Sequence, residues 1–107
     1  MAQQFKFVGG STGTRTRISW PLRAQALVIQ AHRVNGLTGA KAFEAGVAAF
    51  NAEVDVSAQI VSLPPSYTNK NAASVLYGME KRFLQRVNDR NDAEAIAIAQ
   101  ELGILTQ

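Results

Sequence analysis

The chain has 107 residues, a hydrophobic content of 47% and a net charge of +3, which suits one globular domain. It contains no cysteine and a single histidine, His32, which excludes disulfides, thiol catalysis and zinc sites of ordinary composition within one chain. No signal-peptide pattern is visible, and no apolar run reaches the ~20 residues that span a bilayer. We therefore expect a cytoplasmic protein, or one inside a particle assembled there, with no membrane association.

The charges are unevenly distributed along the chain. Residues 1–41 carry six basic residues and no acid, whereas residues 42–107 carry five basic residues and eight acids. Such asymmetry favours an acidic partner, nucleic acid, or an oligomer in which one end of the chain meets the other. In a short chain it also arises by chance.

Residues 5–20 predict a β-hairpin. Apolar and polar residues alternate on both sides of a glycine-rich segment, Gly9 to Gly13. Alternation is typical of strands, and the glycines suit a turn of about five residues. The expected core side of the hairpin is Phe5, Phe7, Ile18 and Trp20, and the expected outer side is Lys6, Arg15 and Arg17.

Two helices are predicted next. Pro21 suits the first position of a helix from Leu22 to about Val34, which Asn35 and Gly36 would end. Thr38 can cap a second helix that runs to about Ala52. Its expected buried face is Ala40, Phe43, Val47 and Phe50. The small residues around Gly46 would let another backbone approach closely, and we expect this helix to pack tightly on a sheet.

The second half of the chain predicts one strand and two helices. Apolar residues alternate with polar ones from Val54 to Leu63, which predicts a third strand that Pro64 and Pro65 would end. A third helix is expected from about Ala72 to Asn88. Its apolar stripe is Leu76, Met79, Phe83 and Val87. Asn91 or Asp92 would cap a fourth helix, and Gly103 with Ile104 would end it in a Schellman motif.

These elements predict an α+β fold. An N-terminal β-hairpin and a third strand would form a small sheet packed by two helices, followed by a C-terminal helical hairpin. We predict a single domain over residues 1–107, with the sheet and its helices in residues 1–65 and the helical hairpin in residues 66–107.

No motif in the sequence indicates catalysis. The glycine-rich segment does not match a P-loop, because Thr14 follows Gly13 and no lysine opens a helix there. The acids are scattered or lie at helix starts, where the helix dipole accounts for them, and no paired acid and base can be defended. We expect no enzymatic activity, no catalytic residues, no metal site and no cofactor.

We expect a small interaction or assembly protein that docks its basic N-terminal ribbon on a protein partner or on copies of itself. A subunit of a larger particle, viral or cellular, would fit this role. The expected partner-binding residues are Lys6, Arg15, Arg17, Arg23 and Arg33. The alternative is a nucleic-acid-binding protein that uses the ribbon and the first helix. Against this alternative, no aromatic residue lies between the basic residues of the outer face to stack on bases, and basic residues also protect exposed strands from aggregation.

Overall fold

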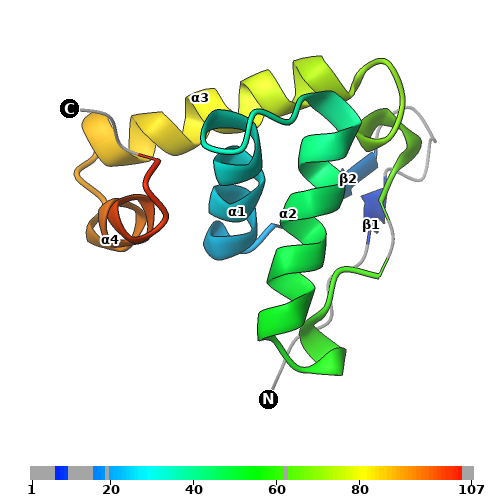
Figure 1. Ribbon diagram of the computed structural model, residues 1–107, viewed down its shortest axis with the longest axis horizontal. Coiled ribbons are helices and arrows are strands. Elements are labelled where there is room, and N and C mark those ends of the chain that lie inside the picture. The colour runs from blue at the N-terminus through cyan, green and yellow to red at the C-terminus, as the bar shows by residue number, and fades with distance from the viewer. Residues whose placement is uncertain (1–6, 10–15, 19, 62, 105–107) are drawn as a thin grey trace.

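A computed structural model describes residues 7–9, 16–18, 20–61 and 63–104. Within this part of the chain there are four α-helices, two short 3-10 helices and two short strands (Figure 1). The α-helices are α1 (Leu22–Arg33), α2 (Gly39–Glu53), α3 (Ala72–Asn88) and α4 (Ala93–Glu101). The 3-10 helices are η1 (Val56–Ala58) and η2 (Pro65–Tyr67), and the strands are β1 (Phe7–Gly9) and β2 (Thr16–Ile18).

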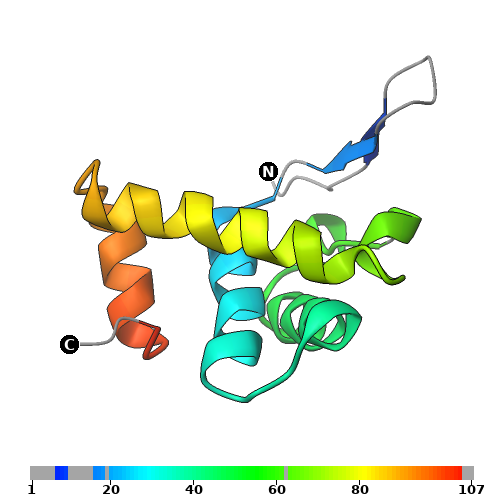
Figure 2. The ribbon, with the colours of Figure 1, turned by 90° about the horizontal axis from the view of Figure 1, so that it is seen from above.

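The predicted α+β fold is wrong, because the described part of the chain is mainly helical. β1 and β2 pair antiparallel, with Phe7 opposite Ile18 and Val8 opposite Arg17. This two-stranded ribbon is the whole of the sheet in the described residues, and it projects away from the helices (Figure 2). In the described part of the chain no small sheet lies beneath α1 and α2, and the buried core residues come mainly from the helices.

The predicted third strand is also wrong. The segment from Val54 to Leu63 contains η1, and Val56 is 78% exposed, so the alternating apolar residues do not share one buried face. Among the described residues of this segment, Ile60 is the one that is buried. The side chain of Asn51 takes the place of a neighbouring strand there. It accepts a hydrogen bond from the Ile60 N–H (2.8 Å) and donates one to the Ile60 carbonyl oxygen (3.1 Å), which satisfies both backbone groups.

Helix α1 is the centre of the fold. It packs against α2, α3 and α4 (Figure 1), and its residues contribute to all three buried clusters. Burial on several sides explains the alanines of its sequence, since small side chains let neighbouring helices approach. The buried residues of α1 are Ala24, Ala26, Leu27, Val28, Ile29 and Ala31. Val34, the predicted end of this helix, follows its last residue and is exposed.

The closest approach in the core is between α1 and α2 at Gly46. A Cβ atom at this position would lie 2.5 Å from the Val28 Cα. The small residues of α2 therefore serve a tight helix–helix crossing, not the packing of a helix on a sheet. Two of the predicted buried residues of α2, Phe43 and Phe50, are indeed buried beside this crossing.

The C-terminal helices follow the prediction closely. α3 has the predicted bounds, and Leu76, Met79, Phe83 and Val87 are all buried. Asp92 caps α4 by accepting hydrogen bonds from the N–H groups of Glu94 and Ala95, whereas Asn91 has a positive φ and does not cap. At the end of α4, the Ile104 N–H donates to the Ala99 carbonyl (2.9 Å) and Ile104 is buried, which is the predicted Schellman motif.

Candidate interaction surface

The structure describes three of the five predicted partner-binding residues, and these three lie in different surroundings. Lys6 and Arg15 lie outside the described residues. Arg17 lies on β2 opposite Val8. Arg23 and Arg33 lie on α1, near its two ends, and both are engaged by carboxylates of the same chain.

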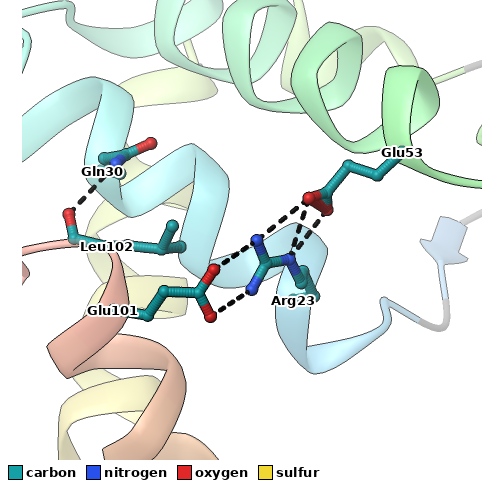
Figure 3. Close-up of polar contacts among 5 residues, drawn as sticks. All are labelled: Arg23, Gln30, Glu53, Glu101 and Leu102. Atoms are coloured by element: carbon teal, nitrogen blue, oxygen red, sulfur yellow. Dashed lines mark hydrogen bonds and ion pairs between the residues drawn. The ribbon is translucent and has the colours of Figure 1, made fainter.

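Arg23 joins three helices through two carboxylates (Figure 3). Its Nε and Nη2 donate to Glu53 at the end of α2 (2.8 and 3.0 Å), and its Nη1 and Nη2 donate to Glu101 at the end of α4 (2.9 and 3.0 Å). Both pairs have the parallel fork geometry that makes arginine–carboxylate pairs strong. Its guanidinium is thus used to fasten α2 and α4 to α1.

The ion pairs change the acidity of the groups involved. Hydrogen bonds to Glu53 and Glu101 raise the pKa of Arg23 above its ordinary value. The hydrogen bond from Arg23, helped by its charge, lowers the pKa of Glu101. A neighbouring polar contact also joins α1 to the end of α4. The Gln30 side chain donates a hydrogen bond to the Leu102 carbonyl oxygen at 3.0 Å (Figure 3).

Arg33 is paired as well. Its Nη1 donates to the Glu80 carboxylate of α3 at 2.8 Å, and the Glu80 side chain is 15% exposed. A guanidinium already paired with a carboxylate has its charge partly offset and fewer free N–H donors for another anion. Arg23 and Arg33 are therefore weaker candidates for contacting a partner than the sequence suggests, and their main contacts are structural.

Trp20 connects the ribbon to the helices. Its ring stacks on Tyr67 (centroids 5.7 Å apart) and also contacts Phe43 (5.9 Å). Its indole Nε1 is buried without a hydrogen-bond partner among the described residues, so ring packing holds this side chain. The Trp20 carbonyl oxygen accepts a hydrogen bond from the Gln25 side chain (3.2 Å). The predicted role of Trp20 in the core is confirmed in this form, and it anchors the base of the ribbon.

A basic hollow that the site prediction missed lies between α1 and α3. It is lined by Gln25, Arg82, Gln85, Arg86 and Arg90 and has a volume of about 310 Å³. The four-residue spacing of Arg82 and Arg86 already places both on one helix face in the sequence. The contribution of Gln25 could not be predicted from the sequence, because Gln25 lies on a helix nearly 60 residues earlier in the chain.

A second hollow is mostly apolar and lies between α2 and the segment that follows it. Its lining includes Val47, Ala48, Ile60, Val61 and Leu63, and its volume is about 440 Å³. Val61 is 61% exposed. This apolar groove is shallow, and its lining adds no titratable group other than Glu44.

A metal site needs a cluster of ligating side chains. The described residues contain no group of three or more histidine, aspartate or glutamate side chains that could hold a metal ion. The Nδ1 of His32 lies 2.9 Å from the Leu37 carbonyl oxygen, so this nitrogen is the N–H donor of the ring and helps to close the turn after α1.

None of the described helices is long and apolar enough to cross a membrane.

Comparison with known proteins gives no relative from which a role could be inferred. The chain matches no protein-family model, and no curated protein and no solved structure matches it significantly. Arguments about function therefore rest on the ribbon, the ion pairs and the two hollows.

Proposed function

We propose that this protein is a non-enzymatic interaction or assembly protein that docks its N-terminal ribbon on a protein partner or on copies of itself. The observation that carries the proposal is the position of β1 and β2. They pack mainly on each other and point away from the helices (Figure 2). A two-stranded hairpin is at best marginally stable alone in water. A ribbon that points away from the helices is expected to pack on another molecule.

The chemistry of a ribbon suggests how docking would occur. Each outer edge of a two-stranded ribbon presents unpaired backbone N–H and C=O groups that a further strand can bind. The basic residues assigned to this segment, Lys6, Arg15 and Arg17, would add attraction to an acidic surface. Trp20 supports this arrangement because its ring fixes the ribbon base against Phe43 and Tyr67.

The alternative of nucleic-acid binding through the ribbon and the first helix has less support. Two of its five residues, Arg23 and Arg33, already bind carboxylates of α2, α3 and α4. The remaining basic residues belong to the ribbon, where they serve a protein partner equally well. We therefore propose the ribbon as the docking element, and we assign Arg23 and Arg33 of α1 a structural role in holding the helices together.

The test uses the full chain and a double charge reversal in the ribbon, Arg15→Glu with Arg17→Glu. Light scattering over a wide concentration range measures self-association, and copurification from the native host, followed by reconstitution of the purified pair, measures partner binding. The matched control is Lys41→Glu with Lys70→Glu, which changes the net charge equally at two exposed positions. We expect the ribbon variant to lose association and the control to keep it. Equal association in both variants, or a strictly monomeric chain that copurifies with nothing, would contradict the proposal.

A further inference from the structure

Three arginines converge on the basic hollow between α1 and α3. Arg82, Arg86 and Arg90 line it together with Gln25 and Gln85, and no acidic side chain is among these lining residues. All five side chains carry N–H donors. The hollow is therefore chemically suited to an anion.

Two of the three arginines have no carboxylate partner among the described residues. Arg82 and Arg90 are exposed, and neither makes a hydrogen bond or ion pair with its side chain within the part of the chain that the structure describes. Arg86 differs, because its Nε and Nη2 donate to Asp92 at 3.0 and 2.8 Å. Arg86 is thus held in place by Asp92, while no described carboxylate offsets the charges of its two neighbours.

The backbone holds this row in position. Arg82 and Arg86 lie one helical turn apart on α3, a rise of about 6 Å. Arg90 follows the end of α3, where its N–H donates to the Gln85 carbonyl at 3.2 Å. The row is longer than a single phosphate or carboxylate needs, which suits a ligand with repeated negative charges.

The helix dipole does not account for the cluster. Cations are stabilised near helix C-termini, and this explains Arg86 in the last turn of α3. Arg82 lies in the turn before, outside the range over which that effect acts. Its guanidinium lies near Gly78, where an added Cβ would be 3.3 Å from Nη1, and it does not turn to any described carboxylate.

We propose that the basic hollow binds the phosphate backbone of a nucleic acid. Arginine forks match phosphate oxygens two at a time, and binding to a nucleic-acid backbone needs charge without apolar contacts. An acidic protein would be expected to add an aromatic or aliphatic anchor, for which the described residues that line this hollow offer no apolar side chain. The inference uses none of the ribbon residues, so it stands or fails separately from the proposed docking of the ribbon.

The experiment measures binding of fluorescently labelled random-sequence DNA and RNA to the full chain between about 50 and 200 mM salt. The variant Arg82→Gln with Arg90→Gln removes the two unpaired charges, and the control Lys41→Gln with Lys70→Gln removes the same charge at two other exposed positions. We expect the arginine variant to weaken binding at least tenfold. The loss of two phosphate contacts should also lower the slope of log K against log salt by about 1.8 for duplex DNA. The control should stay within about twofold of the unmodified chain.

Two further measurements test the arginine forks and the class of ligand. The variant Arg82→Lys with Arg90→Lys keeps the charge but loses the fork, and we expect intermediate affinity from it. If the glutamine variant fails to fold, this lysine variant still tests the two positions. Absence of binding at the lower salt, or equal losses in the glutamine variant and its control, would overturn the proposal. So would competition by polyglutamate as strong as that by unlabelled nucleic acid, which would assign the hollow to an acidic protein.

Discussion

Gly46 of α2 lies against Val28 of α1 with no room for a side chain, since a Cβ at Gly46 would be 2.4 Å from the Val28 Cγ2. This crossing is what lets α1 and α2 pack as neighbours along their lengths. The first prediction concerns this contact. Gly46→Ala should lower the free energy of unfolding by about 1–3 kcal/mol, because the core cannot admit the methyl group without shifting the helices.

Gly78→Ala is the matched control for that variant. Gly78 also lies inside a helix, but an added Cβ there meets chiefly the flexible end of Arg82 at 3.3 Å. Alanine is favoured over glycine in a helix by about 1 kcal/mol. Urea denaturation should therefore show a loss of stability for Gly46→Ala and no loss for Gly78→Ala. Equal effects of the two substitutions would contradict the close crossing.

The second prediction concerns the bracing of Ile60 by Asn51. Asn51→Ala removes the partner of both backbone groups of Ile60 and should cost about 1–3 kcal/mol, since buried polar groups are then left unpaired. Asn51→Asp keeps the acceptor for the Ile60 N–H and should cost less. Hydrogen exchange at the Ile60 amide is the direct measurement. Unchanged protection of this amide in Asn51→Ala would show that the segment is held in some other way.

The third prediction is a dependence of stability on pH through Asp92. Hydrogen bonds from Arg86 and from the backbone N–H groups of Ala95 and Glu94 lower its pKa below the ordinary value of 3.8. The folded chain therefore binds this proton less readily than the unfolded chain does. The stabilisation from Asp92 is complete above pH 3.8 and is lost as the pH falls through 3.8 toward the lower pKa of the folded state.

Thermal unfolding of the Asp92 variants between pH 7 and pH 2.5 checks this. Asp92→Ala should lower the Tm at pH 7, because α4 loses its cap. Asp92→Asn can still accept the capping hydrogen bonds but cannot titrate, so its Tm should fall less steeply below pH 4. A pH profile of Asp92→Asn that coincides with that of the unmodified chain would assign the acid sensitivity to other carboxylates, such as Glu101.

The fourth prediction concerns the Arg23 ion pairs. Arg23→Lys keeps the charge but loses the two forks on Glu53 and Glu101, and it should lower the free energy of unfolding by up to about 1 kcal/mol. Arg33→Lys loses a single hydrogen bond to Glu80 and should cost less. Urea denaturation of both variants at about 50 mM and at about 1 M salt measures these losses. The difference between the two variants in the free energy of unfolding should be smaller at the higher salt, because salt screens the ion pairs. A larger effect at Arg33 than at Arg23 would contradict the assigned network.

The success of the helix predictions has a local physical cause. The bounds and the buried stripe of α3 follow from residues within the helix itself, and the end of α4 follows from Gly103 and Ile104. The strand prediction for Val54 to Leu63 was wrong because the alternation there is that of a strand, while Asn51, in the last turn of α2, replaces the missing partner strand. Periodicity does not reveal such a substitute.

The candidate sites were harder to predict because they depend on distant pairs. Glu53 and Glu101 lie 30 and 78 residues from Arg23, so its use within the fold could not be read from the sequence around it. The four-residue spacing of Arg82 and Arg86 can be read from the sequence and places both on one helix face. Their convergence with Arg90 on a hollow lined by Gln25 depends on the packing of α3 against α1.

The most direct test of the docking proposal is hydrogen exchange of the ribbon amides, measured in the free chain and in its assembled complex. If the ribbon is the docking element, the amides of residues 7–9 and 16–18 should exchange readily in the free chain, since a lone hairpin opens easily. The same amides should become strongly protected on assembly. Protection that leaves these amides unchanged and appears instead on α3 or along the apolar groove would contradict the account.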